Sequence, residues 1–382
     1  MTFFAVLGLL LVAATGSAAD TPALWGRLTP GPHAVGFRVL RHRDAARTQP
    51  DGSRRPVQIS LWYPAARAAG GKGLRYADYV LVSAGETTLA DPAPAEATAA
   101  LAAYRAFLTS HGVPEAGAAA WMESPLYALR DAPAARTTFP LALIAQGNGG
   151  AVQDQAVLGE FLASHGFVVA TCPSPVRLGA RMESDADVLP VAEAQALDLA
   201  FALDVLRRER LADVRRLGIV GYSFGARAAL LLAARQPSAK ALVSLDGGIG
   251  TASGGPWLTA SALDRARFRI PILHVYEETE EFMRPDFTLL DSVAGAGQLR
   301  LKVTGLHHMD LITLGFASAA LPELGTPAPE RAALDDRLAA TFTYALRFLQ
   351  ARVSGDAAAR RFVARDPPAN GYPAALLAES RK

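Results

Sequence analysis

The sequence predicts an α/β fold, in which a mostly parallel central sheet carries helices on both faces. From residue 139 onward, short apolar runs alternate with helix-like segments, which is the pattern of a parallel sheet. Before them, VGFRVL (35–40) and VQISLWYP (57–64) alternate like antiparallel strands joined by a polar turn at Asp51-Gly52. The chain has 382 residues, of which 51% are hydrophobic and 19% charged, so it is long and apolar enough to bury a large core.

The elements follow in order along this pattern. Six apolar runs predict the core strands: 139–147, 166–172, 217–221, 239–248, 270–278 and 299–305. Four helices are expected over 153–165, 191–208, 226–236 and 331–353. Three-to-four spacing supports the second of these helices, through Leu197, Phe201, Asp204 and Val205. The last helix is amphipathic and carries one face of Leu334, Leu338, Phe342, Ala345 and Leu349.

Composition divides the chain into five segments. They are a signal peptide (1–19), N-terminal strands of the sheet (20–64), an Ala-rich helical insertion or cap (65–138), the catalytic core (139–353) and a polar, irregular C-terminal tail (354–382). The first segment has an apolar core over 3–14 and small residues up to Ala19, which predicts export to the periplasm or medium with cleavage near Ala19. No Lys or Arg precedes that apolar core.

Charge and cysteine usage exclude several kinds of partner. The formal net charge is +2 and the arginines are scattered, so no nucleic-acid surface is expected. No later apolar run approaches membrane-spanning length, so no stable membrane anchor is expected. Cys172 is the single cysteine, which rules out an internal disulfide and a Cys-based zinc site and predicts a packing role at a strand end. We expect neither cofactor nor metal.

The pentapeptide GYSFG (221–225) places Ser223 between two glycines where a predicted strand meets a predicted helix. A GxSxG match arises by chance in about one chain in ten of this size, so the context carries the argument. A serine nucleophile of this type needs a sharp turn between a buried strand and a helix, and the glycines give that turn room. The sequence therefore predicts Ser223 as a nucleophile.

A serine nucleophile needs a base and an orienting acid at the ends of later strands. His307 and His308 directly follow the last predicted strand, and either can supply the base. For the acid, Asp246 ends the strand after the elbow helix, whereas Glu277 and Glu278 end the next strand along. These three acids remain alternatives on position alone.

The oxyanion of an acyl-transfer intermediate needs two donors. The backbone N–H of Phe224, directly after the nucleophile, supplies one. The second is expected from the glycine-rich loop GNGG (147–150) after the first core strand.

Together these motifs resemble the platelet-activating-factor acetylhydrolase-like, dienelactone hydrolase-related branch of the α/β-hydrolases. The resemblance covers about 35–349 and rests on the WYP tripeptide (62–64), the stretch 139–175, the elbow, VSLDGG (243–248) and GLHH (305–308). It implies the α/β-hydrolase fold, with Asp246 as the acid, His308 rather than His307 as the base, and Asn148 as the second oxyanion donor. This chain has Gln146 where the family often has histidine.

The expected function is a serine ester hydrolase acting on a small-molecule or lipid ester through an acyl-enzyme. Two alternatives remain. The same triad can transfer the acyl group to an alcohol, or the fold can serve as a non-catalytic domain that binds a lipid or a partner.

Overall fold

The structure is a computed structural model of the chain. The predicted signal peptide, residues 1–19, lies outside the residues that it describes. Those described are 21–49, 51–66, 71–254, 257, 261, 263–293, 297–372 and 376–381.

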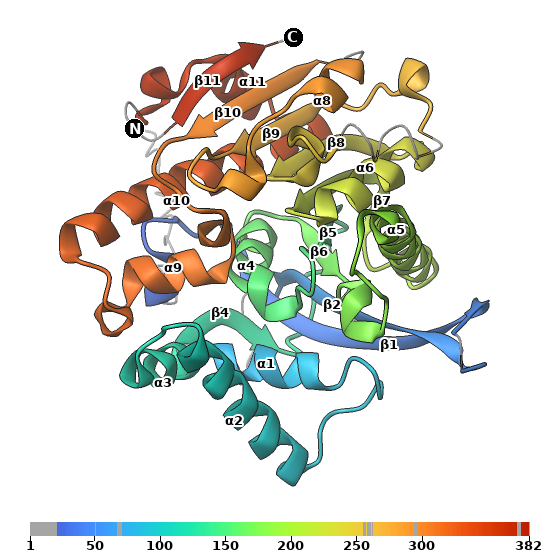
Figure 1. The fold of residues 1–382 in the computed structure, drawn as a ribbon, viewed down its shortest axis with the longest axis vertical. Helices are drawn as coiled ribbons and strands as arrows, with labels where there is room; N and C mark the ends of the chain where they lie inside the picture. Colours follow the sequence, from blue (N-terminus) through green and yellow to red (C-terminus); the bar gives the residue numbers. More distant parts are fainter. Residues whose placement is uncertain are drawn as a thin grey trace, which may run out of the picture.

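The described residues form one sheet of eleven strands in the order β11-β10-β9-β8-β7-β5-β6-β2-β1-β4-β3 (Figure 1). Neighbouring strands from β10 through to β6 are parallel, as the sequence predicts. The predicted N-terminal hairpin is also present, because β1 and β2 pair antiparallel. The strands are β1 (Ala34–Thr48), β2 (Arg54–Ala65), β3 (Gly73–Arg75), β4 (Pro125–Arg130), β5 (Pro140–Ala145), β6 (Val168–Thr171), β7 (Asp213–Tyr222), β8 (Ala239–Leu245), β9 (Ile272–Tyr276), β10 (Gln298–Val303) and β11 (Leu376–Arg381).

Helices cover both faces of the sheet because successive strand residues point to opposite sides. On β5, Leu141 and Leu143 pack into one buried cluster with α5 and α6, whereas Ala142 and Ile144 pack into the other with α4 and α10. The helices are α1 (Tyr76–Ala84), α2 (Pro94–Ser110), α3 (Glu115–Glu123), α4 (Ala156–Ser164), α5 (Asp185–Arg208), α6 (Gly225–Arg235), α8 (Thr288–Ser292), α9 (Thr313–Ala320), α10 (Ala328–Leu349) and α11 (Ala357–Ala364).

The segment between the N-terminal hairpin and the core, predicted as a helical insertion, holds β3, α1, α2, α3 and β4. Its two strands extend the sheet beyond β1, and its three helices lie together at that end of the molecule (Figure 1). One long apolar cluster runs from α1 and α3 into the core helices α4 and α10. The insertion is therefore packed onto the core through a shared interior.

Glu160 of α4 joins this insertion to the core. It is fully buried and accepts four hydrogen bonds, from Trp25 Nε1 (3.2 Å), the Tyr79 hydroxyl (2.8 Å), Tyr127 N (2.8 Å) and Ala128 N (3.0 Å). Burial raises the pKa of the Glu160 carboxyl to about 7, although these donors oppose the shift. Nothing in the sequence pattern marked this residue.

We expect Glu160→Gln to lower the free energy of unfolding by about 3 kcal/mol, because the amide nitrogen cannot accept and leaves buried donors without a partner. Urea unfolding at neutral pH measures the loss. Glu323→Gln, at an exposed glutamate, is the matched control and should change the value by less than about 0.5 kcal/mol. An equal stability of the two variants would contradict a connecting role for Glu160.

Two expectations about helices come out differently. On α10 all five predicted inward residues are buried. On α5 the predicted helix is present, but the spaced residues do not mark its buried face, because Leu197 is 45% exposed while Leu199, Leu203 and Leu206 are buried. The buried stripe begins at Val191 and ends at Leu206, and of the four residues named from the sequence only Val205 belongs to it. In this Ala-rich segment several stripes are apolar, and only packing against the sheet selects one.

The prediction of an irregular tail after residue 354 is also corrected. Residues 357–364 form α11, whose Ala359 and Val363 join the apolar cluster of α10. Residues 376–381 form β11, which pairs antiparallel with β10. Edge pairing uses backbone groups, so it does not require the apolar alternation that marks a strand in a sequence.

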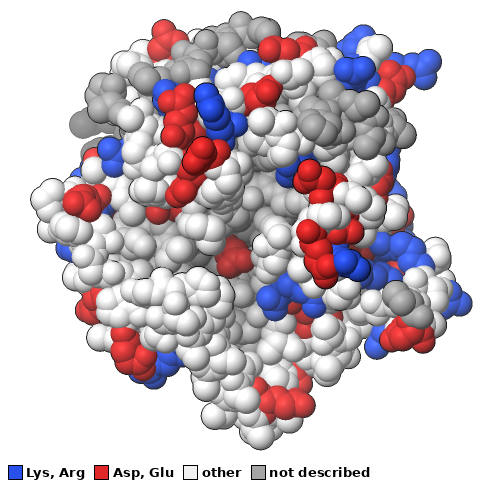
Figure 2. Space-filling model, in the orientation of Figure 1, with Lys and Arg blue, Asp and Glu red and all other residues white. Residues whose placement is uncertain are grey.

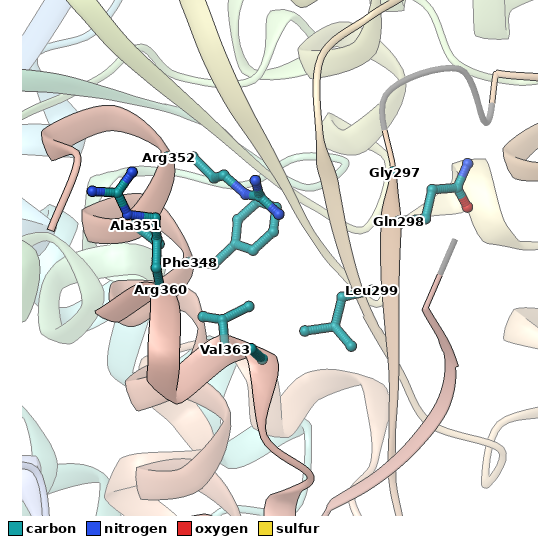
Figure 3. A pocket seen from close by; sticks show the side chains of 9 residues that line it. Gly297, Gln298, Leu299, Phe348, Ala351, Arg352, Arg360 and Val363 are labelled. Atoms are coloured by element: carbon teal, nitrogen blue, oxygen red, sulfur yellow. The ribbon is translucent and has the colours of Figure 1, made fainter. Parts of the chain in front are cut away.

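A cavity of about 280 Å³ lies where β10 begins, against α10 and α11. Figure 3 shows Arg352 and Arg360 on its helical side and Leu299 on its strand side. In the parallel part of the sheet this is the amino end of a strand, opposite the edge at which the predicted catalytic residues lie.

Candidate active site

Three predicted residues from distant parts of the chain meet at the carboxyl edge of the sheet. Ser223 follows β7, Asp246 follows β8, and His308 lies in the loop after β10. His308 Nδ1 lies 2.5 Å from Asp246 Oδ2, and His308 Nε2 lies 2.8 Å from Ser223 Oγ. A carboxylate only accepts, so Nδ1–H donates to Asp246, and Nε2 is left to accept from the serine hydroxyl. This is the hydrogen-bonding order of a serine, its base and an orienting acid.

Ser223 has the strained backbone of a sharp strand-to-helix turn. Its φ is +52°, a left-handed conformation that is uncommon for a residue other than glycine. The two flanking glycines are needed for packing. A Cβ on Gly221 would lie 2.4 Å from Ala226 Cα, and one on Gly225 would lie 2.3 Å from the carbonyl oxygen of Ala145. The turn therefore brings α6 against β5 and β7 more closely than any side chain allows.

Asp246 is 1% exposed. Burial raises the pKa of its carboxyl, while the hydrogen bond with His308 opposes that shift. Its backbone also adopts a positive φ of +41°, and its N–H donates to the Val275 carbonyl at 2.7 Å. The β9 backbone thus holds the carboxylate against His308.

The side chains of the alternative candidates do not join this chain of hydrogen bonds, although the backbone N–H of Glu277 donates to Asp246 Oδ1 at 3.4 Å. The Glu277 carboxylate accepts from the backbone N–H groups of Thr279 and Glu280. Glu278 forms an ion pair with Lys302. His307 points to Glu280, with Nδ1 3.1 Å from Oε1, and its side chain is 61% exposed.

Two aromatic residues that the sequence analysis did not single out hold the His308 ring. Tyr222 stacks on it, with ring centroids 5.0 Å apart, and its hydroxyl donates to the His308 carbonyl at 3.1 Å. Phe282 meets the ring edge-on at 5.3 Å. Tyr222 lies within the GYSFG motif, so its place was available from the sequence. Phe282 lies in the 279–298 segment, whose path one sequence does not reveal.

The predicted oxyanion loop lies against the elbow. A Cβ on Gly147 would be 2.9 Å from the Tyr222 ring and 3.4 Å from Ser223 Cβ. The backbone N–H of Gly149 donates to Ser174 Oγ at 3.1 Å, and that of Gly150 donates to the Gly147 carbonyl at 3.0 Å.

The two predicted oxyanion donors are the backbone N–H groups of Asn148 and Phe224, the residues that follow Gly147 and Ser223. Within the described residues, the backbone N–H groups of Asn148 and Phe224 donate to no other group of the protein. Both are therefore available to an acceptor from outside.

A cavity of about 520 Å³ adjoins this site. Its lining includes Asn148 on one side and Met309, next to His308, on another, while α1, α2 and α3 close it from the insertion. Figure 2 shows this face of the molecule hollowed near its centre, with acidic atoms in the hollow. Among the described residues, no group of three or more His, Cys, Asp or Glu side chains could hold a metal ion, and no helix is long and apolar enough to cross a membrane.

Comparisons with known proteins agree with this architecture. Residues 129–292 match the model of the Dienelactone hydrolase family. Over 119 residues, 30% of this chain, the sequence is 31% identical to Cutinase 2 of Thermobifida cellulosilytica and to Cutinase cut1 of Thermobifida fusca. These matches span 41% and 34% of the lengths of the two cutinases.

Among solved structures, the fold is similar to that of a ferulic acid esterase from Streptomyces cinnamoneus. The TM-score is 0.57 at 20% sequence identity, over 86% of this chain and 93% of the other. The predicted fold class is thus confirmed. The chain has the α/β-hydrolase fold, and its central part, residues 129–292, is similar to the dienelactone hydrolase family.

Proposed function

We propose that the protein is a serine hydrolase that cleaves carboxylic esters. The observation that carries this proposal is the continuous hydrogen-bonded series Ser223–His308–Asp246, with distances of 2.8 and 2.5 Å, at the carboxyl ends of three parallel strands. The family match and the cutinase relatives support an esterase rather than another use of the fold.

In the proposed reaction, Ser223 Oγ attacks the ester carbonyl while His308 Nε2 takes the hydroxyl proton. Asp246 holds the imidazole in the required tautomer and stabilises the charge that it acquires. His308 then gives the proton to the leaving alcohol, which departs as the acyl-enzyme forms. Water, deprotonated by the same histidine, attacks the acyl-enzyme and releases the acid and free Ser223.

The backbone N–H groups of Phe224 and Asn148 are the proposed oxyanion donors. Their lack of an acceptor among the described residues and the contact of Gly147 with Ser223 support this assignment. Two such preorganised donors stabilise the tetrahedral intermediate by several kcal/mol. Because both are backbone groups, the presence of Gln146 where the family often has histidine leaves them in place.

At a finer level, we propose that the chain belongs to the platelet-activating-factor acetylhydrolase-like branch and acts outside the cytoplasm, after removal of residues 1–19. The motifs at 62–64 and 139–175 support the branch, and the apolar N-terminus supports export.

Hydrolysis of p-nitrophenyl acetate, combined with labelling by a fluorophosphonate, tests the proposal. We expect turnover, and we expect mass spectrometry to place the label on Ser223, because only an activated serine reacts readily with such a reagent. Full turnover without any label on Ser223 would refute this mechanism.

Asp246→Asn should lower kcat by on the order of 10⁴, because an amide at this place favours the wrong imidazole tautomer. Glu277→Gln and Glu278→Gln are matched controls, since each makes the same change at an acid that does not reach His308. Steady-state kinetics with p-nitrophenyl acetate should show losses below about tenfold for both. A loss at either control equal to that of Asp246→Asn would reassign the acid.

A further inference from the structure

The cavity beside the proposed active site has a lining suited to a flat ring. Tyr76, Tyr104, Phe107 and Trp121, from the three inserted helices, contribute aromatic surfaces. Tyr76 lies against Trp121 with ring centroids 4.8 Å apart, and its hydroxyl hydrogen-bonds with that of Tyr104 at 2.7 Å. A volume of about 520 Å³ is in the range of small-molecule sites.

Two residues that line the same cavity carry buried polar atoms without partners. Gln153 is 4% exposed and Trp121 2% exposed, yet Gln153 Oε1 and Trp121 Nε1 have no hydrogen-bond partner among the described residues. Buried polar atoms without a hydrogen-bond partner are rare, and they cost free energy unless a ligand or water pairs with them. An unbranched apolar chain filling the cavity would leave them unpaired.

Asp154 adds a carboxylate to this wall. One oxygen accepts the backbone N–H of Ala151 at 2.9 Å. Desolvation raises the pKa of Asp154 to about 6, so the group is mainly ionised at neutral pH and can only accept. A ligand beside it must offer a donor.

The cavity does not suit an anionic ligand. Arg177 is its one cationic lining residue among those described, and its guanidinium already pairs with Glu86 at 2.5 Å. A carboxylate in the ligand would meet Asp154 without a free cation to offset the repulsion. The polar group of the ligand is therefore a donor that carries no negative charge.

We infer that this cavity binds a hydroxyl-bearing aromatic ring of the ester substrate, with the phenolic O–H donated to Asp154 or to Gln153 Oε1. The role of the cavity in turnover rests on the proposed esterase function, but binding of the aromatic ring does not require turnover. On this inference, Gln153 and Asp154 determine the substrate specificity. The preferred substrates are then hydroxyaryl esters.

The test compares substrates that differ by one hydroxyl. One pair, methyl 3-(4-hydroxyphenyl)propanoate and methyl 3-phenylpropanoate, places the ring on the acyl side. The other pair, 4-hydroxyphenyl acetate and phenyl acetate, places it on the alcohol side. We expect the hydroxylated member of at least one pair to have a kcat/KM about tenfold higher.

Calorimetric binding to the Ser223→Ala protein, which does not depend on turnover, should show the same preference in Kd for the same pair. Failure of the esterase proposal is thus separable from failure of this one. If there is no turnover but the binding preference is preserved, only the esterase proposal is refuted. If there is turnover but no preference in kcat/KM or Kd, only the inference about the cavity is refuted.

Gln153→Leu removes the amide at nearly constant size and should reduce the preference for the hydroxyl severalfold. Gln155→Leu makes the same change in the same turn at a buried glutamine that does not line the cavity, and it should keep the preference. Asp154→Asn serves as the second variant, since its amide oxygen can still accept from Ala151.

If the hydroxylated and the unsubstituted substrate of each pair have equal kcat/KM and Kd values, water satisfies the polar atoms of Gln153 and Asp154. That result would overturn the inference. A preference that survives in both Gln153→Leu and Asp154→Asn would overturn it as well.

Discussion

Ser223→Ala is expected to lower kcat for p-nitrophenyl acetate by on the order of 10⁶, the loss that follows removal of a serine nucleophile. The residue is placed for this role by the elbow, where its hydroxyl lies 2.8 Å from His308 Nε2. Alanine keeps the Cβ and loses only the attacking oxygen, so the loss reports chemistry. The oxyanion donors remain and leave a small residual rate.

The control for this variant is Ser53→Ala, in the turn between β1 and β2, which should keep full activity. Thermal unfolding should show that the Ser223→Ala protein is folded and of similar stability. A folded Ser223→Ala protein with wild-type turnover would exclude an acyl-enzyme on this serine.

His308→Ala should lower kcat by a similar factor, whereas His307→Ala should cost less than about tenfold. The two histidines are adjacent in the chain, so they form a matched pair. His308 is 5% exposed and bonded to both Ser223 and Asp246. His307 is turned toward Glu280 at the surface.

Steady-state kinetics on both variants, with p-nitrophenyl acetate at saturating concentration, makes this comparison. Because the nucleophile and its base act as one unit, the double variant Ser223→Ala/His308→Ala should be no slower than either single variant. A larger loss of kcat in His307→Ala than in His308→Ala would assign the role of the base to His307. A multiplicative loss in the double variant would mean that the two residues act independently.

Predictions that rest on local patterns agree well with the structure. The strand from 217 to 221, the elbow and the helix from 226 to 236 are all present, because each depends on neighbours in the chain. The face of α10 was also predictable, since its apolar stripe is unambiguous. The face of α5 was not, because an Ala-rich helix offers more than one such stripe.

The acid shows where position in the sequence stops being informative. Asp246 and Glu277 end neighbouring parallel strands, so both lie at the same edge of the sheet. The structure separates them by hydrogen bonding, because the Glu277 carboxylate accepts from two N–H groups of its own loop, whereas Asp246 has His308 within 2.5 Å. That choice depends on loop conformations that no local pattern describes.

By itself the sequence determined the parallel core of the sheet with its N-terminal hairpin, the elbow at Ser223 and the set of residues from which a triad could be drawn, because strand ends and sharp turns have short-range signatures. The family resemblance implied His308 and Asp246, but only the tertiary structure brings them to the serine. Only the tertiary structure also decided that Glu160 joins the insertion to the core and that the inserted helices form a cavity lined by Asp154. Each of these depends on contacts between segments far apart in the chain, with geometry set by packing.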